Sequence, residues 1–260
     1  MKWDPIQYGR YAEERARPFL DLVARVAAAA PRRVIDLGCG PGTLTALLGE
    51  RWPGARVEGI DASPEMIAEA LPLANPALTF RVGDIADWAM PADADVIVSN
   101  AALQWVPGHR EVLRRCARQL PAGGWLAFQL PGNFGSPSHQ LMRELAASPR
   151  WARHLDGVLR HHDSVGEPAE YAALLLEAGL RADVWESTYL HVLGGTDPVL
   201  EWVRGTGLRP VLAALDSSSQ DPADFEAEYA AALRAAYPAT ARGTLFGFRR
   251  VFAVGHRAAS

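Results

Sequence analysis

Three glycines spaced two residues apart, Gly38, Gly40 and Gly42, directly follow the run Val34-Ile35-Asp36-Leu37, which is apolar except for Asp36. The run predicts a buried strand, and the residues from Thr43 onward predict the start of a helix. Because glycine has no Cβ, the backbone of such a turn can approach a ligand closely. The spacing G-x-G-x-G differs from the G-x-G-x-x-G of dinucleotide-binding turns. It predicts a nucleotide-binding loop, with an ordinary strand-to-helix connection as the alternative.

Acidic side chains lie at or just beyond the ends of the first three predicted strands. Asp36 comes just before the glycine loop, where a carboxylate can bond to turn amides or to an amino group of a ligand. Asp61 can accept hydrogen bonds from both hydroxyls of a ribose, or it can serve the helix start at Ser63 and Pro64. Asp84 can accept from an exocyclic amino group such as that of adenine, or it can form a turn after glycine.

The fourth predicted strand ends at Asn100, whose backbone carbonyl is placed to accept from an ammonium group of a ligand. Gln104 and Trp105 follow it and offer a neutral amide and a ring N–H. Both can orient a carboxylate without forming a full ion pair, although Trp105 fits a core position equally well. Met66 has the same two interpretations, since it can pack on adenine or fill the core.

The elements that must position these residues alternate along the first half of the chain. Strands are predicted at 34–37, 56–60, 78–82, 94–99 and 125–130, and helices at 13–30, 43–51, 63–71 and 109–119. In the first helix we expect an apolar face of Leu20, Val23, Ala24 and Ala27. Strands alternating with helices at short spacing predict a parallel sheet with right-handed crossovers.

The second half of the chain has a different pattern. Helices are predicted at 138–147, 168–178, 198–203, 210–215 and 222–237, and strands at 183–192 and 245–254. The fold class is therefore α/β, a doubly wound Rossmann-like sheet of about seven strands, parallel with one antiparallel strand, plus a helical cap. We expect one domain over 1–260, with the core at about 30–133, 167–193 and 244–256 and the cap at about 134–166 and 194–243. Ligands bind such sheets at the carboxyl ends of the strands.

Composition narrows the possible partners. The formal net charge of -4 and the pI of about 6.0 give no case for nucleic acid or an anionic membrane. No apolar run approaches the ~18 residues of a membrane span, and the chain begins without an apolar signal region. Cys39 and Cys116 form no C-x-x-C pair, and the acids near His161 and His162 are not spaced as a metal site. We expect a cytoplasmic protein without metal, a monomer or a weak homodimer.

Together the motifs at 34–130 resemble the class I S-adenosylmethionine (SAM) methyltransferases. The resemblance implies SAM as methyl donor and S-adenosylhomocysteine as product, with Asp61 on the ribose and Asp84 on the adenine. Tyr8, Tyr11 and Arg15, at the N-terminal end of the chain, are expected to close over SAM, with Arg15 meeting its methionine carboxylate. The expected cofactor-binding residues are Tyr11, Arg15, Asp36, Gly38, Cys39, Gly40, Gly42, Asp61, Ala62, Met66, Asp84, Ile85 and Asn100.

Stretches along nearly the whole chain resemble the family of trans-aconitate 2-methyltransferases more closely. They include 3–5, 100–107, 188–191, 201–210 and 248–252. The resemblance implies methyl transfer from SAM to one carboxylate of trans-aconitate, giving a monomethyl ester. The stretches at 43–45 and 150–166 depart from the family pattern, and neither contains an expected cofactor-binding residue.

Methyl transfer to a carboxylate needs the protein mainly to position the two reactants. A carboxyl group with a pKa near 4 is ionised at neutral pH and needs no general base. Holding the reacting atoms in line can supply roughly 7–11 kcal/mol, and we expect Gln104 and Trp105 to take part. The remaining carboxylates of a small polycarboxylate need cations. The candidate substrate-binding residues are Arg209, Arg249, Arg250, His191 and Tyr8. Strand alternation sends Arg249 and Arg250 to opposite faces, so one of them is expected to face the site.

Three other functions remain open from the sequence. The first is a SAM-dependent methyltransferase for another small acid or a natural-product acceptor. The second is an NAD-binding oxidoreductase, which the glycine spacing and Asp84 disfavour. The third is a SAM-binding module without catalysis, which replacing Asp61 by alanine would distinguish. For the arginines the alternative is an ordinary solvated surface, and for His191 a core position.

Overall fold

The computed structural model describes residues 12–159, 164–217 and 221–259, with the backbone alone at 12–15. Within it the chain divides into two compact units. Unit 1 comprises Met1–Pro131, Gly166–Ser187 and Arg250–Ser260, and unit 2 comprises Gly132–Val165 and Thr188–Arg249. The predicted residues Tyr8 and Tyr11 lie outside the described residues, as do His161 and His162. Arg15 lies in the first helix, but its side chain is not among those described.

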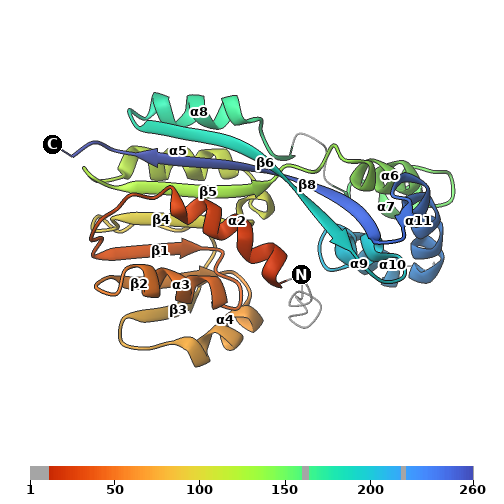
Figure 1. The fold of residues 1–260 in the computed structure, drawn as a ribbon, viewed down its shortest axis with the longest axis horizontal. Coiled ribbons are helices and arrows are strands. Elements are labelled where there is room, and N and C mark those ends of the chain that lie inside the picture. The colour runs from red at the N-terminus through yellow and green to blue at the C-terminus, as the bar shows by residue number, and fades with distance from the viewer. Residues whose placement is uncertain (1–11, 160–163, 218–220, 260) are drawn as a thin grey trace. The chain divides into compact units, whose positions relative to one another are not determined.

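The main sheet has the strand order β3-β2-β1-β4-β5-β8-β6 (Figure 1). Its strands are β1 (Arg33–Leu37), β2 (Arg56–Asp61), β3 (Leu78–Val82), β4 (Val96–Asn100), β5 (Trp125–Pro131), β6 (Arg181–Leu193) and β8 (Gly243–His256). The first five pair in parallel, and β8 runs antiparallel to β5. This confirms the predicted fold class. The prediction missed a short strand, β7 (Ala239–Thr240), which pairs with β8.

Unit 1 carries helices between its strands, as the alternating pattern predicts. They are α2 (Ala12–Ala24), α3 (Thr43–Arg51), α4 (Pro64–Ala70), α5 (His109–Gln119) and α8 (Pro168–Glu177), with 3-10 turns η1 (Leu71–Leu73) and η2 (Leu103–Trp105). The residues of β1, β4 and β5 are buried almost without alternation. A strand buried on both faces needs helices on both sides of the sheet, so its sequence is mostly apolar.

The first helix departs from its prediction in both length and face. α2 ends at Ala24 instead of residue 30, and Leu20 is 51% exposed. Ala24 and Ala27 are exposed too. The buried face consists of Phe19, Leu22, Val23 and Val26, so Val23 is the correctly predicted member. The buried set has the same helical spacing as the predicted one, shifted by one residue, and it places the large aromatic ring inside.

The early end of α2 has a local cause. The backbone N–H groups of Arg25 and Val26 donate to the carbonyls of Leu22 and Val23, three residues back, at 3.1 and 3.0 Å. Such bonds tighten the last turn and use the carbonyls that a longer α-helix would need. The alanine run that follows favours a helix by propensity alone, but Pro31 follows it directly and disfavours a helical conformation in the residue before it.

Unit 2 is built from helices and from the remaining parts of β6 and β8. Its helices are α6 (Pro137–Ala146), α7 (Ala152–Leu155), α9 (Pro198–Arg204), α10 (Arg209–Asp216) and α11 (Pro222–Ala236). The sequence did not predict α7. α11 packs against α6, where the Tyr229 hydroxyl donates to the Ser138 carbonyl at 2.7 Å. The prediction that these helices form a cap stays a prediction.

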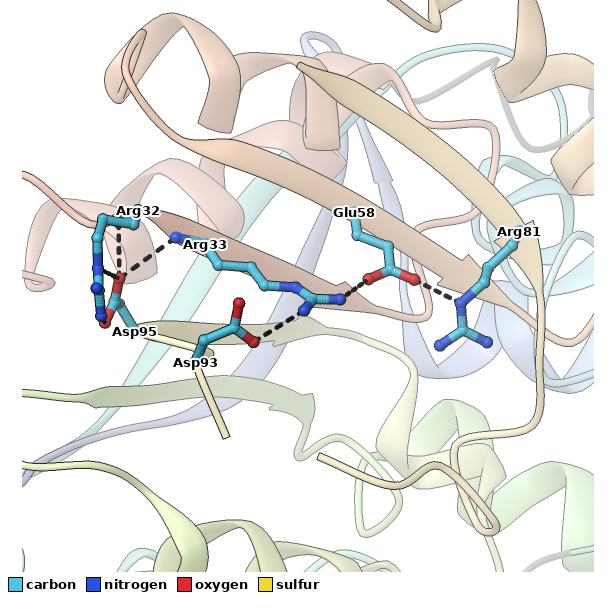
Figure 2. Close-up of polar contacts among 6 residues, drawn as sticks. All are labelled: Arg32, Arg33, Glu58, Arg81, Asp93 and Asp95. Atoms are coloured by element: carbon cyan, nitrogen blue, oxygen red, sulfur yellow. Dashed lines mark hydrogen bonds and ion pairs between the residues drawn. The ribbon is translucent and has the colours of Figure 1, made fainter. Parts of the chain in front are cut away.

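A chain of ion pairs joins β1, β2, β3 and the loop before β4 (Figure 2). Arg33 donates to Asp93 at 2.8 Å and to Glu58 at 2.9 Å, and Glu58 also accepts from Arg81 at 2.5 Å. Burial works to raise the pKa of Glu58, but the hydrogen bonds from Arg81 and Arg33 outweigh it and lower that pKa. The network therefore keeps Glu58 ionised, and the negative charge of Glu58 balances positive charge on Arg33 and Arg81.

Asp95 extends the network at the start of β1. It accepts from the backbone N–H groups of Arg32 and Arg33 at 2.7 and 3.3 Å and pairs with the Arg32 side chain (Figure 2). Two loop acids, Asp93 and Asp95, thus tie the approach to β4 onto β1. These contacts fix strand positions within the sheet on which the glycine loop depends.

Candidate functional site

The glycine loop lies where β1 ends, held against the end of the neighbouring strand. The N–H groups of Gly38 and Cys39 donate to the Ile60 carbonyl at 2.8 and 3.0 Å. Gly38, Gly40 and Gly42 have φ angles of 84°, 54° and 78°. All three adopt the left-handed conformation, which a side chain with a Cβ resists. The predicted turn is therefore present, and its shape depends on glycine at every second position.

The three glycines differ in what surrounds them. A Cβ on Gly38 would lie 2.1 Å from the Ala102 Cβ, and one on Gly42 would lie 2.7 Å from the Phe80 ring. At Gly40 no described heavy atom lies within 4 Å of that position. Packing against the protein thus explains Gly38 and Gly42, whereas at Gly40 nothing in the described part of the chain occupies the position of a Cβ. Ala102 and Phe80 were not predicted, since only the three-dimensional fold brings them to the loop.

Asp61 ties this loop to the start of α4. Its Oδ2 accepts from the Gly40 N–H and its Oδ1 from the Ser63 N–H, both at 2.9 Å. Ser63 itself caps α4, accepting from the Met66 N–H at 3.3 Å, with Pro64 at the first helical position. Asp61 therefore bonds to the start of α4, which was one of its two expected roles. A carboxylate has about four acceptor positions, so Asp61 retains capacity for ribose hydroxyls.

Asp36 is buried directly beneath the loop and is 3% exposed. Its Oδ2 accepts from the Thr45 hydroxyl at 2.6 Å, whereas hydrogen bonds to the turn amides, one of its two expected roles, are not present in the described residues. Burial, opposed by the Thr45 hydrogen bond and aided by the charge of Asp61, raises the pKa of Asp36 to about 7. A cationic ligand group beside it would favour its ionised form. Thr45 was missed, although a threonine buried on a helix suggests a polar partner.

The residues after β2 and β3 form the rest of the predicted nucleotide side. Asp84 is exposed, and its Oδ1 accepts from the Ala86 N–H at 2.8 Å, so its expected turn-forming role is present. Ile85 and Met66 are buried at 6% and 4% exposure, and Ala62 is exposed. Met66 is therefore part of the core, which was one of the two interpretations of this residue.

The Cys39 side chain is buried within the glycine loop. It is 7% exposed, and its Sγ lies 3.6 Å from the Gly40 carbonyl oxygen. Burial raises the pKa of its thiol well above the ordinary value, and the charges of Asp36 and Asp61 add to this. Because the thiolate is the reactive form, Cys39 serves the loop as a small buried side chain.

The end of β4 leads into a strained turn. Ala101 has a φ of 54°, unusual for a residue with a Cβ. Its N–H donates to the Gln129 carbonyl at 2.9 Å, and its carbonyl accepts from the Gln104 Nε2 at 2.5 Å. Gln104, 9% exposed, thus holds the turn through its amide, and half-buried Trp105 follows in η2. Such strain persists where surrounding contacts fix it, and it is frequent at functional sites.

Asn100 and Gln129 carry unsatisfied polar atoms at neighbouring strand ends. The two residues pair in register between β4 and β5. Asn100 Oδ1 and Gln129 Nε2 are buried and have no hydrogen-bond partner among the described residues. Gln129 was missed, although a glutamine inside the apolar run of β5 is a sequence signal. Buried polar atoms without partners are rare in native proteins, and a bound ligand or water is one explanation for such atoms.

Of the predicted acceptor-binding arginines, Arg250 belongs to unit 1 and Arg249 and Arg209 to unit 2. Arg250 is 6% exposed and donates to Gln129 Oε1 at 3.2 Å. Arg249 is half-buried and donates to the Gly132 carbonyl at 3.4 Å. The two adjacent arginines therefore have different partners. Arg209 is half-buried at the first position of α10.

His191 lies in unit 2 with aromatic neighbours. Its ring centroid is 4.6 Å from that of Trp202, and it also stacks on Tyr189 at 6.5 Å. A second histidine, His139, lies near the segment that precedes Arg209, because a Cβ on Gly207 would come within 3.2 Å of its Nε2. His139 was not predicted. Among the described residues no group of His, Cys, Asp and Glu could hold a metal ion.

The chain is similar in sequence to known methyltransferases. A family model described as a methyltransferase domain matches residues 11–185. The trans-aconitate 2-methyltransferase of Streptomyces avermitilis is 56% identical over 99% of this chain and 97% of its own length. That of Rhodococcus jostii is 51% identical over 97% of this chain and 98% of its own. Over the described residues, no helix is long and apolar enough to cross a bilayer.

Solved structures support the same fold. The YcgJ protein of Bacillus subtilis is similar at a TM-score of 0.59 and 18% identity, over 94% of this chain and 100% of its own. A geranyl diphosphate methyltransferase solved with SAM is similar at a TM-score of 0.55 and 16% identity, over 97% of this chain and 89% of its own. At sequence identities this low, the similarity supports a shared fold and nothing about function. From the family model and the sequence relatives, we conclude that the chain belongs to the methyltransferase domain family and, within it, to the trans-aconitate 2-methyltransferases.

Proposed function

We propose that this chain is a SAM-dependent carboxyl O-methyltransferase acting on trans-aconitate, with a monomethyl ester and S-adenosylhomocysteine as products. The identity of 56% over 99% of the chain to a relative of that name supports the substrate. The observation that carries the cofactor assignment is the link from Asp61 to Gly40, where no atom of the described residues takes the place of a Cβ. An acid at the end of β2 bound to a glycine loop at the end of β1 fits an adenosine group.

The residues that would hold SAM fall into two groups along the sheet edge. Asp61 would bind the ribose and Asp84 the adenine, next to Ala62, Met66 and Ile85. Asp36 and Asn100 would meet the ammonium of the methionine end, with Tyr11 and Arg15 closing over it; the loop residues Gly38, Cys39, Gly40 and Gly42 would face the cofactor. The buried acid Asp36 and the unsatisfied Asn100 Oδ1 both fit a cation that can donate hydrogen bonds.

When bound, SAM supplies an electrophilic methyl group, and the acceptor carboxylate supplies the attacking oxygen. That oxygen is ionised at neutral pH, so the protein need not remove a proton. Its task is to orient the two reactants, which is worth roughly 7–11 kcal/mol. Gln104 and Trp105, on the strained turn after β4, are proposed to orient the reacting carboxylate. Neutral donors there leave the oxygen nucleophilic.

The non-reacting carboxylates are proposed to bind arginine. Guanidinium groups bind carboxylates in a bidentate way and keep their charge. Arg250 is the leading candidate because it is buried beside Gln129 at the carboxyl end of β5. Arg209, Arg249, His191 and Tyr8 are the further candidates. Such a set of cations would suit a small polycarboxylate.

A panel of acids tests the substrate directly. Purified protein is incubated with methyl-labelled SAM and, separately, with trans-aconitate, cis-aconitate, citrate, a small monocarboxylic acid and an aromatic acid. We expect base-labile label with the highest kcat/KM on trans-aconitate. Preferred labelling of the aromatic acid or the monocarboxylic acid would transfer the assignment to another acceptor. Absence of label with every acid, while S-adenosylhomocysteine still binds, would favour a binding module without catalysis.

A further inference from the structure

Arg115, on α5, holds the loop that follows β3. Its Nη2 atom donates to the carbonyl oxygens of Ala86 and Trp88, both at 3.1 Å. One guanidinium nitrogen carries two N–H groups, which suffice for two acceptors. Arg115 is half-buried and lies 29 and 27 positions along the chain from these partners. A helix that follows β4 thus holds two carbonyls of the loop that precedes β4.

The same loop carries Asp84, which bonds to a residue that Arg115 holds. The Ala86 N–H donates to Asp84 Oδ1 at 2.8 Å, and the Ala86 carbonyl accepts from Arg115. Ala86 is therefore bonded on both sides, to the carboxylate and to the guanidinium. Because Asp84 is exposed, packing does little to fix its carboxylate, and the bond from Ala86 orients it.

Apolar contacts keep this loop against the core but do not set the direction of the Ala86 peptide. Ile85 and Trp88 are buried, at 6% and 5% exposure, on either side of Ala86. The backbone bond across the turn, from the Trp88 N–H to the Ile85 carbonyl, is long at 3.4 Å. Apolar burial is non-directional, whereas a hydrogen bond from a charged donor fixes the direction of a carbonyl. Arg115 therefore adds orientation to a loop that burial already anchors.

The direction of the Asp84 carboxylate matters for the recognition of a purine base. An ionised carboxylate only accepts hydrogen bonds, so it can pair with the exocyclic amino group of adenine. A base with an oxygen in that position would place two acceptors against each other, and a site that bonds an amino group rejects such an analogue. Because hydrogen bonds weaken steeply away from linear geometry, this discrimination depends on orientation. Loss of the restraint on Ala86 should therefore reduce selectivity for adenine more than it reduces general affinity.

We propose that Arg115 is a positioning residue that orients the Asp84 carboxylate, through the Ala86 peptide, toward the exocyclic amino group of adenine. This inference rests on the proposed function, in which Asp84 binds the adenine of SAM. Arg115 acts through the loop and need not touch the cofactor. The alternative is that Arg115 only stabilises the fold, and the two roles predict different ligand selectivity.

Titration calorimetry with two ligands that differ at the exocyclic group tests the proposal. They are S-adenosylhomocysteine and S-inosylhomocysteine, in which an oxygen replaces that amino group. For wild type we expect a preference of about a hundredfold for the adenosyl ligand. Arg115→Met removes the guanidinium and should lower this preference about tenfold, chiefly by weakening the binding of the adenosyl ligand. Equal losses for both ligands, with the preference unchanged, would indicate a merely structural role and overturn the proposal.

Arg114→Met is the matched control, since it removes the same charge from the neighbouring position of α5. Arg114 pairs with Glu111 at 3.5 Å, an ion pair at the surface, so this variant should keep both affinities within twofold of wild type. Arg115→Lys serves if Arg115→Met does not fold, because it keeps a cationic donor and loses only the planar fork. A selective loss of about threefold for the adenosyl ligand in Arg115→Lys would support the proposal, and equal losses for both ligands would overturn it.

A double-mutant cycle with Asp84 gives an independent check. Because Arg115 is proposed to act through Asp84, Arg115→Met should change the affinity for S-adenosylhomocysteine less than twofold in an Asp84→Ala background. A tenfold loss in that background, as large as in wild type, would show that Arg115 acts by another route and would contradict the proposal.

The outcomes also separate this proposal from the function on which it rests. If wild type binds neither ligand, the proposed function fails. If wild type binds both ligands equally, cofactor binding stands, but Asp84 does not recognise the amino group and the proposal is overturned. If wild type prefers the adenosyl ligand and Arg115→Met keeps the full preference, the proposed function stands and the role of Arg115 is refuted.

Discussion

Two regions of unit 1 use arginine in opposite ways. In the network of β1, β2 and β3, each arginine meets a carboxylate, and the pKa of Glu58 is lowered by its partners Arg81 and Arg33 (Figure 2). At the end of β5, Arg250 instead donates to the neutral oxygen of Gln129. Lys2 is the only lysine of the chain, so nearly every side-chain cation is an arginine. Residue type alone therefore does not say which contacts an arginine makes, because both regions use the same side chain with different partners.

Asp61→Ala should have the largest effect of these variants, and the effect should be on S-adenosylhomocysteine affinity. Asp61 holds the loop through Gly40 and Ser63 and is proposed to bind both ribose hydroxyls. Loss of two hydrogen bonds to a charged group, about 4 kcal/mol together, should weaken S-adenosylhomocysteine binding about a thousandfold. Titration calorimetry measures it. Asp93→Ala, the same change in the ion-pair network, should leave that affinity within twofold; equal losses in both variants would show that Asp61 acts through stability.

Gly38→Ala and Gly40→Ala sharpen the difference between packing and ligand binding. Both positions have a positive φ, but only at Gly38 would a Cβ meet Ala102. We expect Gly38→Ala to lose about 3 kcal/mol of unfolding free energy, from left-handed strain plus overpacking, and Gly40→Ala about 1 kcal/mol. Urea unfolding checks this. Gly40→Ala should nevertheless reduce S-adenosylhomocysteine affinity in folded protein, and a fully retained affinity would remove Gly40 from the ligand site.

The pH dependence of cofactor binding probes Asp36. Its pKa is raised to about 7, so protonation leaves about half of the sites ionised at that pH. If the ionised form binds the ligand ammonium, affinity should rise about tenfold between about pH 6 and about pH 8. The pKa of buried His109 is lowered to about 4, so it does not titrate in this range. Calorimetry with Asp36→Asn should give a weaker but flat profile, and an unchanged slope in that variant would exclude Asp36 as the titrating group.

Glu58→Gln should have the smallest effect, confined to stability. Its folded pKa lies below the ordinary 4.5, so its contribution is present above that value and is lost as pH falls through the folded pKa. We expect a loss of about 1 kcal/mol near pH 7 that shrinks toward zero in acid. Urea unfolding of both proteins near pH 7 and in acid, below the folded pKa of Glu58, checks the sign of this change in unfolding free energy. Affinity for S-adenosylhomocysteine should be unchanged, and a large loss of affinity would make the network part of the site.

Local sequence chemistry predicted the part of the site that depends on neighbours in the chain. The glycine turn, the Ser63 cap and the turn at Asp84 each need only a few consecutive residues, and all three are present. The alternation of strands with helices predicted a parallel sheet, and β1 to β5 pair in parallel. The role of Met66 in the core was one of two expected outcomes.

Contacts between distant residues were not predictable in the same way. Thr45 meets Asp36, and Phe80 and Ala102 meet the glycine loop, only because the strands pair in one register. The Gln129–Arg250 contact spans 121 positions of the chain. The face of α2 was predicted one residue out of place, since apolar spacing is satisfied equally by Leu20 or by Phe19 and only packing against β4 and β5 selects between them.

The most direct test of this account is product analysis by mass spectrometry. Purified wild-type protein is mixed with SAM and trans-aconitate, and both products are quantified over time. The account predicts S-adenosylhomocysteine and trans-aconitate monomethyl ester in equal amounts, with neither formed when trans-aconitate is omitted. S-adenosylhomocysteine binding without any ester, or ester formed at the same rate after Asp61→Ala, would contradict it.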